Sequence, residues 1–375
     1  MFDRFFQGEH VKEKIALTLA SMFMLVPCAQ AACTNTGFVR DGINLTAALI
    51  NPATVTTPLD ATTCDIGVYY DNNQAGGVAT LNAVDIRGAR YYGVVVNGDA
   101  GPLAIHLTNN LVHNIGNVPF DGTQHGVGIY VRAFSTFNVT GEIMGNTVSA
   151  YQKGGVVVTG AGVRLSKLDN NRIYGLGHVT FIAQNGIQIS YGAMPFPSEI
   201  IGNTVVGNSF IGTGDGSSSA GILVVGGAGF GLCPNGDPCP YEKNVLIGIN
   251  SALNQVGTNF LFNNDVGIWA YNLAGDGVSA PPVPTSILIV GNIAGDDQAY
   301  NQSYQAGISD FGNTDYILYN YILQGGGYGN PCTSNIDVTG SINPQTIGNT
   351  PAVCTPTTTA AAASAKALKP SPDMP

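Results

Sequence analysis

Three ionisable residues near the middle of the chain have the types and spacing that proton-transfer chemistry needs. His125 lies three residues before Gly128, and Lys153 lies two residues before Gly155, the equivalent glycine of a related segment. Asp121 precedes His125 by four residues. Removal of a proton beside a carboxylate requires a base and a group that stabilises the developing charge. His125, Lys153 and Asp121 are therefore candidate catalytic residues. The alternative interpretation is that they are solvated turn residues.

A second set of residues has side chains suited to sugar binding. Aromatic rings with hydrogen-bonding neighbours match the faces and edges of sugar rings. Residues that alternate with core positions in stacked strands form one outward column. The candidate substrate-binding residues in and beside this column are Tyr130, Arg132, Gln188, Trp269 and Tyr271. Apolar residues mixed into the column favour an alternative, in which long loops such as 191–200 and 272–286 cover this face as a second core.

Both sets depend on a short phrase, glycine followed by alternating apolar residues, that recurs along the chain. Self-similarity at a spacing of about 20–50 residues is the signature of repeat architectures. The intervals are unequal, which predicts a constant strand core with loops of variable length. The glycine phrase begins at Gly93, Gly128, Gly155, Gly186, Gly221, Gly267 and Gly307. A second phrase, asparagine followed by apolar residues, occurs at Asn110, Asn146, Asn171, Asn203, Asn292 and Asn320.

Each copy of the glycine phrase alternates as a strand does. Ile129 and Val131 are predicted to point inward and Tyr130 outward. We expect short strands stacked in parallel, coil upon coil, at about 4.8 Å. Asparagines at the same turn of each coil are expected to form a ladder of side-chain hydrogen bonds. Glycine is expected to permit a tight bend before each strand. The sequence thus predicts an all-β, parallel β-helix solenoid of about nine or ten coils.

The pairing of an asparagine-apolar strand with a downstream Gly-Ile-x-Val strand resembles the right-handed parallel β-helix repeat family, the pectate-lyase-like superfamily. The resemblance covers roughly residues 80–325. It implies a right-handed, single-stranded parallel β-helix. That superfamily includes polysaccharide lyases and hydrolases, phage tailspikes and non-enzymatic surface proteins. Two polygalacturonase-like pairs, Asp296-Asp297 and Asn313-Thr-Asp315, stand in reversed order and lack the later motifs. We therefore interpret them as turn residues.

The two ends of the chain differ from the repeats. Residues 1–31 combine basic residues, a short apolar run and the small-x-small pattern Ala29-Gln-Ala31, as in an export signal. The apolar run is shorter than the roughly 20 residues of a membrane span. We expect a secreted or periplasmic protein without a membrane span. The predicted organisation is a signal peptide over 1–31, one β-helix domain over 32–350 with an N-terminal cap over 32–80 and coils over 80–350, and a low-complexity tail over 351–375.

Six cysteines remain after Cys28 leaves with the signal, and they fall into three pairs of near neighbours. An even number in an exported chain indicates disulfides. Metal binding is the rival interpretation, but the spacings do not match a zinc pattern. The preferred pairs are Cys33 with Cys64, Cys233 with Cys239, and Cys332 with Cys354.

Composition and charge exclude several functions. The chain is 44% hydrophobic with only 10% charged residues, which indicates a large core rather than disorder. The net charge is −10 and the basic residues are scattered, so nucleic acid is not an expected partner. Calcium needs several converging carboxylates. Because the sequence shows no such group, we predict no cofactor, and a calcium site stays an open alternative without support.

Two functions remain open from the sequence. The first is a carbohydrate-associated protein that binds or cleaves a polysaccharide or cell-surface glycan, by lyase-type chemistry if it is an enzyme, with a glycoside hydrolase as the other enzymatic option. The second is a non-catalytic extracellular or cell-surface β-helix, adhesin-like or structural. Association of several copies of the chain, as a homo-oligomer, is left open.

Overall fold

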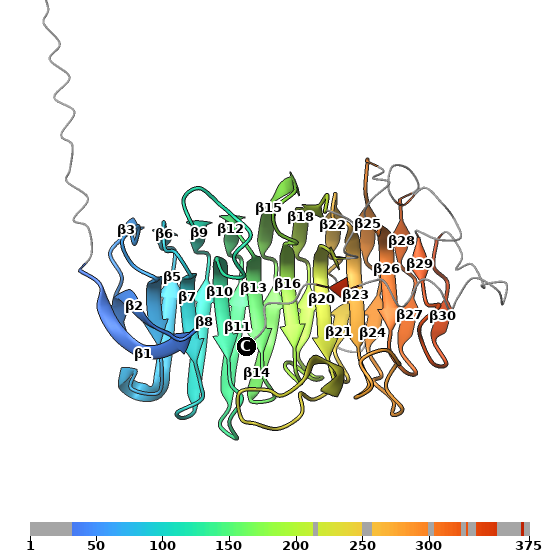
Figure 1. Ribbon diagram of the computed structural model, residues 1–375, viewed down its shortest axis with the longest axis horizontal. Helices are drawn as coiled ribbons and strands as arrows, with labels where there is room; N and C mark the ends of the chain where they lie inside the picture. The colour runs from blue at the N-terminus through green and yellow to red at the C-terminus, as the bar shows by residue number, and fades with distance from the viewer. Residues whose placement is uncertain are drawn as a thin grey trace, which may run out of the picture.

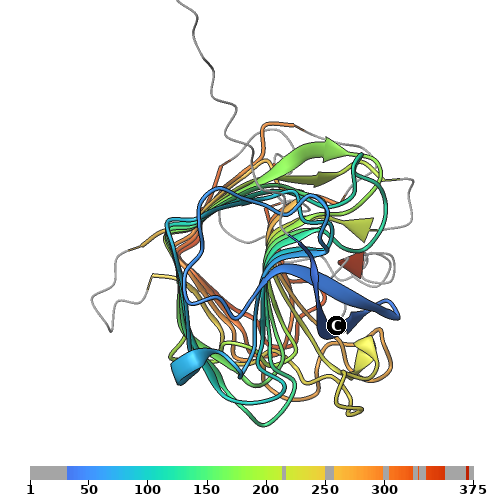
Figure 2. The same cartoon turned by 90° about the vertical axis from the view of Figure 1, so that its left-hand side faces the viewer.

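The computed structural model describes residues 32–212, 217–249, 257–298, 304–323, 328 and 335–350, and the backbone of 369–370. These residues form mainly strands and turns, and the short 3-10 segments include η1 (Ala75–Gly77) and η2 (Ala228–Phe230). Figure 1 shows the strands side by side along the long axis, and Figure 2 shows the chain winding in successive layers around one interior. The predicted all-β class is confirmed, and the arrangement is consistent with a β-helix solenoid.

Three long sheets account for most of the described strands. Sheet 1 consists, in spatial order, of β1 (Thr34–Arg40), β2 (Ile43–Ile50), β4 (Ile66–Tyr70), β7 (Tyr92–Asn97), β10 (Val127–Arg132), β13 (Gly154–Thr159), β16 (Asn185–Ser190), β20 (Ala220–Gly226), β23 (Val266–Asn272), β26 (Ala306–Phe311) and β29 (Ile336–Asp337). Sheet 2 consists of β5 (Val78–Asn82), β8 (Leu103–Thr108), β11 (Val139–Met144), β14 (Val163–Asp169), β17 (Glu199–Ile201), β21 (Leu246–Gly248), β24 (Leu288–Val290), β27 (Tyr316–Leu318) and β30 (Gln345–Ile347). Sheet 3 consists of β3 (Leu59–Asp60), β6 (Asp85–Arg87), β9 (Leu111–Ile115), β12 (Thr147–Tyr151), β15 (Arg172–Val179), β18 (Thr204–Phe210), β22 (Phe260–Phe262), β25 (Ile293–Gly295) and β28 (Tyr321–Ile322).

The chain visits the three sheets in turn, for example β7, β8, β9 and then β10. All neighbours within these sheets pair in parallel, except β1, which pairs antiparallel with β2. The glycine phrases lie in adjacent strands of sheet 1, and Ile129 pairs with Val94 on one side and Val156 on the other. The strands β2, β3 and β4 lie within the range predicted as a cap and already pair in parallel with strands that follow.

The interior between the sheets is filled by stacked aliphatic side chains. Ile129 and Val131 lie in this core with Val156 and Val158 of the next coil. Tyr130 belongs to a separate cluster on the opposite face of sheet 1. The predicted alternation is therefore confirmed, because neighbouring residues of the phrase enter different clusters.

An asparagine ladder runs along the turn between sheets 2 and 3, as predicted. Each side-chain amide donates to the Oδ1 of the next asparagine at 2.9–3.1 Å. Each amide also donates to a backbone carbonyl, as Asn203 does to Leu168. The ladder includes two members that the sequence pattern missed, Asn259 and Asn349. Its members are Asn110, Asn146, Asn171, Asn203, Asn259, Asn292, Asn320 and Asn349.

The phrase glycines have a different role from the one predicted. Gly128 lies inside β10 rather than before it, and its φ is not in the left-handed region. A Cβ atom on Gly128 would collide with the side chain of Val148 and with the carbonyl oxygen of Gly155. The prediction of a tight bend is wrong: glycine is needed here because sheet 1 approaches sheet 3 too closely for a side chain.

Two disulfides join Cys33 to Cys64 and Cys233 to Cys239, as predicted from their spacing. Disulfides form in oxidising compartments, so they are consistent with an extracellular protein. The third predicted pair, Cys332 with Cys354, lies outside the described residues, as does the predicted signal over 1–31. Most of the predicted tail over 351–375 also lies outside them, apart from β31 (Lys369–Pro370), which pairs with β19 (Ser217–Ser218). In the described part of the chain, no helix has the length and apolar character needed to cross a membrane.

Candidate functional site

The predicted catalytic residue Asp121 lies in the loop of residues 116–126, which joins β9 to β10. Its carboxylate accepts hydrogen bonds from the side chains of Thr123 and Asn117, and from the amide of Gln152 at 3.2 Å. The bonds from Thr123 and then from Asn117 lower the pKa of Asp121 to about 2. A carboxylate with so low a pKa is a poor proton acceptor at neutral pH, and its bonds hold the loop together.

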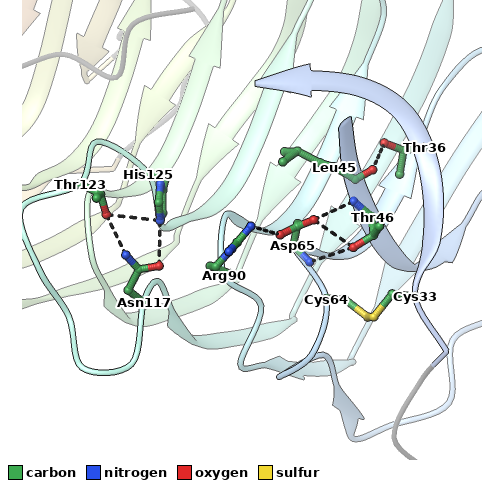
Figure 3. A network of polar contacts seen from close by, with 10 residues as sticks. All are labelled: Cys33, Thr36, Leu45, Thr46, Cys64, Asp65, Arg90, Asn117, Thr123 and His125. Carbon is green, nitrogen blue, oxygen red and sulfur yellow. Dashed lines mark hydrogen bonds and ion pairs between the residues drawn. A yellow bond between two sulfur atoms is a disulfide. The ribbon is translucent and has the colours of Figure 1, made fainter. Parts of the chain in front are cut away.

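His125 lies at the other end of the same loop, against Tyr91. The two rings stack at 4.0 Å, and His125 is buried. Its Nε2 lies 3.0 Å from Oδ1 of Asn117 and 3.3 Å from the hydroxyl of Thr123 (Figure 3). Burial, with a contribution from the charge of Arg90, lowers the pKa of His125. The imidazole is therefore neutral at neutral pH, and it belongs to the same network as Asp121.

Lys153 lies on the neighbouring coil, as predicted, where its backbone N–H donates to the carbonyl of Gly126. Its side chain, however, is fully buried, and Nζ donates to the carbonyl of Ala183 at 2.9 Å. The structure thus brings Asp121 and His125 together but directs the Lys153 ammonium into the interior. An ammonium in that position is not accessible to a polymer on the surface.

The predicted sugar-binding residues Tyr130 and Arg132 are covered by the N-terminal hairpin. Phe38 of β1 packs 6.5 Å from the ring of Tyr130 and lies 5.2 Å from the guanidinium of Arg132. The Arg132 guanidinium also donates to Asp99 at 2.6 Å. Figure 1 shows β1 crossing over the first strands of sheet 1. This part of the outward face is a second core, as in the alternative interpretation, but its cover is the N-terminal hairpin and not the loops 191–200 and 272–286 that the sequence suggested.

The other predicted members of the outward column are buried as well. Gln188 is fully buried and its amide donates to the hydroxyl of Ser190 at 3.1 Å. Trp269 and Tyr271 pack edge to face at 5.6 Å in a cluster that includes Leu273 and Ala280 of the predicted covering loop 272–286. Aromatic rings so enclosed serve packing, and they present no open face to a sugar.

A cavity of about 560 Å³ lies instead on the outer side of sheet 3, near its first strands. Its floor carries Arg87 of β6 and His113 of β9, which are paired neighbours in the sheet. One wall is apolar and comes from the 116–126 loop. The cavity is lined by Thr62, Arg87, Gly88, His113, Asn114, Asn117, Val118, Pro119 and Phe120.

Each basic side chain of the cavity floor has a carboxylate beside it. Arg87 lies 3.4 Å from the carboxylate of Asp60, and His113 Nε2 lies 2.9 Å from that of Asp85. Hydrogen bonds from Thr62, with a smaller contribution from Arg87, lower the pKa of Asp60, which is therefore ionised at neutral pH. The floor presents donors and acceptors without a strong net charge, as a neutral polar ligand requires.

The sequence patterns missed this cavity, although one signal pointed to its floor. Arg87 and His113 are the outward residues of strands whose inward residues, Ile86 and Val112, are core. A list of the outward-facing residues of successive sheet 3 strands, like the list made for sheet 1, would have placed Arg87 and His113 side by side. The apolar wall carries no such signal, because it is formed by a loop that belongs to one coil alone.

The predicted residues Asp121 and His125 adjoin the cavity without lining it. Both bond to Asn117, which is part of the wall. Among the residues with described positions, no group of three or more His, Cys, Asp or Glu side chains is arranged to hold a metal ion. What the site offers chemically is therefore hydrogen bonding and apolar contact.

No family model, no curated protein and no solved structure matches the chain. The function is therefore inferred from the geometry of the fold and of the cavity.

Proposed function

We propose that the chain is an exported, right-handed parallel β-helix of about nine or ten coils with an N-terminal cap, of the pectate-lyase-like kind. It binds a neutral polysaccharide, as part of a cell-surface or extracellular glycan, in the cavity on sheet 3. The observation that carries this proposal is the pairing of an apolar wall, Val118 to Phe120, with a polar floor, Arg87 and His113. A sugar ring has the matching character, with an apolar face and a hydroxyl-bearing edge.

The charge pattern supports a neutral glycan over a uronate polymer. Asp60 lies beside Arg87 and Asp85 lies beside His113, and the whole chain carries a net charge of −10. A polyanion would meet repulsion from this surface, and no described cation on the floor lacks a carboxylate beside it.

Binding without cleavage agrees better with the site than lyase chemistry does. A lyase needs a base that is exposed to substrate and a cation that neutralises the substrate carboxylate. The candidate Lys153 is buried, and the hydrogen bonds to the carboxylate of Asp121 lower its pKa to about 2.

Calorimetric titration with neutral and acidic oligosaccharides tests the proposal. We expect binding of a neutral oligosaccharide, and we expect Phe120→Ala and His113→Ala each to weaken it at least about tenfold. Matched controls are Phe137→Ala, an exposed aromatic outside the cavity lining, and His106→Ala, which removes a similar His–carboxylate pair on sheet 2. Both controls should bind as the parent does.

Two results would overturn the proposal. One is the absence of binding across the panel, which would favour the structural or adhesin-like alternative. The other is equal loss in the cavity variants and in the controls. Appearance of an unsaturated sugar product in uronate incubations would instead establish a lyase.

A further inference from the structure

The apolar wall of the cavity is held in place by side chains rather than by its own backbone. Within the described residues, backbone–backbone hydrogen bonds fix the 116–126 loop at its ends, through Gly116, His125 and Gly126. Between them, the backbone N–H groups of Asn117 and Asp121 donate to one side-chain oxygen, Oε1 of Gln152. The position of Val118, Pro119 and Phe120 therefore depends on the side-chain network below them.

Besides Gln152, the side chain of Asn117 also joins that network to the wall. Its side-chain amide donates to Asp121 at 2.8 Å and to the Thr123 hydroxyl at 3.0 Å. With both amide hydrogens used, the remaining Oδ1 accepts from His125 Nε2 at 3.0 Å. This arrangement requires the hydrogen of the neutral imidazole to be on Nε2. Figure 3 shows His125, Thr123 and Asn117 in one triangle of contacts.

His125 is held in this position by its ring as well. The imidazole stacks on Tyr91 at 4.0 Å with an interplanar angle of 24°, and it is 7% exposed. The Arg90 guanidinium also lies over the Tyr91 ring, 5.0 Å from its centre. A second proton on the imidazole would therefore create a buried cation close to an existing one.

The charged groups around His125 determine how readily its imidazole takes up a second proton. Arg90 and Arg40 oppose it, while Asp121 and Asp41 favour it. Arg90 is itself paired with Asp65 at 2.8 Å, and burial raises the pKa of Tyr91, which stays neutral. Burial is the largest influence on the His125 pKa, ahead of Arg90, so the balance disfavours the charged imidazole.

We propose that His125 is a positioning residue whose neutral imidazole holds Asn117 and the apolar wall of the cavity, and whose protonation in acid releases that wall and weakens glycan binding. The inference rests on the function proposed above for the cavity. An imidazolium cannot remain in the enclosed site beside Tyr91 and Arg90 without repulsion, so it leaves the stack. The bond to Asn117 is then lost, and the Asn117 side chain keeps only its bonds to Asp121 and Thr123, so the wall beside it is held less firmly.

The wall itself can be observed without any ligand. In the full-length protein, NMR signals of the Val118 methyl groups and the Asn117 side-chain amide should titrate with the His125 ring. Their common midpoint should lie below the ordinary histidine value. If those signals stay constant while the ring titrates, the inference is wrong. This result does not depend on glycan binding, so it separates failure of the inference from failure of the proposed function.

Two variants separate positioning from mere packing. His125→Gln supplies an amide donor that does not titrate, so it should retain neutral-pH affinity and lose the pH dependence. His125→Phe preserves the ring contact with Tyr91 but cannot donate to Asn117, so affinity should fall about tenfold at every pH. His106→Gln, an exposed histidine on sheet 2, is the matched control and should leave the profile unchanged. A His125→Gln variant with the parent's pH profile would overturn the proposal.

Discussion

Gly128 of β10 and Val148 of β12 approach so closely that no side chain fits between them. The two residues belong to different sheets, and the contact is repeated along the stack by Gly155 with Ile173 and by Gly186 with Val205. The repeated glycine therefore marks the line along which sheets 1 and 3 meet inside the molecule.

Replacement of this glycine should destabilise the fold. A Cβ at position 128 would press on Val148 and on the carbonyl of Gly155, so we expect Gly128→Ala to lower the free energy of unfolding by about 2 kcal/mol. Urea unfolding followed by circular dichroism measures this change. Gly275→Ala is the control, because its Cβ would have one neighbour, at 3.8 Å. Equal stability of the two variants would contradict the close-approach explanation.

Replacement of one ladder asparagine should lower the free energy of unfolding more than replacement of an exposed asparagine does. Asn203→Ala leaves the buried carbonyl of Leu168 and the buried N–H of Asn171 without their partners. Buried polar groups left without a partner cost about 1–3 kcal/mol each, so we expect a loss of about 3 kcal/mol. Exposed Asn73→Ala should change stability by less than about 0.5 kcal/mol. A ladder variant as stable as the Asn73 variant would show that the amide chain is dispensable.

Stability should decline as the pH rises from acid to mildly alkaline. Burial raises the pKa of Glu242 to about 8 from its ordinary 4.5, against the opposing bonds from Ala193 and Gly192 and the charge of Arg164. A carboxyl whose folded pKa is raised binds more protons in the folded state. Its contribution is therefore complete below about pH 4 and is lost as the pH approaches 8.

Glu242→Gln isolates this effect, because glutamine has the shape of the protonated acid and does not titrate. The Tm of the variant should exceed that of the parent at about pH 8.5, and the difference should shrink toward about pH 5. Differential scanning calorimetry at several pH values provides the comparison. If the difference in Tm between variant and parent grew toward acidic pH, its sign would be opposite to the one expected for a buried carboxyl.

The two described disulfides should differ in their effect on stability. Cys33 and Cys64 are 31 residues apart, whereas Cys233 and Cys239 are six apart. Chain-entropy reasoning gives about 3.5 kcal/mol for the longer loop and about 2 kcal/mol for the shorter one. Double Cys→Ala variants of each pair, compared by urea unfolding, test the order. A larger loss from the Cys233–Cys239 pair would indicate that native packing around Tyr191 and Phe134, not loop length, sets the effect.

The interior of the fold was predictable because each coil repeats the same short-range pattern. Alternation at Ile129, Tyr130 and Val131 specifies which side chains enter the core, and the asparagine phrase specifies the ladder. Asn259, followed by Phe260 and Leu261, fits the phrase as well as Asn320 with Tyr321 does, so the pattern could have identified it. Local pattern therefore sufficed for the architecture of the sheets.

The site was not predictable in the same way, because its parts come from unrelated segments. Asp60 reaches Arg87 across 27 residues and Asp85 reaches His113 across 28, with no repeat that relates the carboxylates. Lys153 was expected at the surface, where lysine usually lies, and its burial depends on the carbonyl of Ala183 on the next coil. Such contacts depend on which loops meet, and loop sequence carries no period.

The asparagine ladder has a consequence for how this protein can change over evolutionary time. Successive members are separated by as few as 25 and as many as 56 residues, yet every link has nearly the same length. The asparagine thus brings each coil back into register with the coil before it, whatever the length of the loops between the two asparagines. Loops can lengthen, shorten or be exchanged without shifting the strands that follow, so the outer surface can diversify while the framework stays constant.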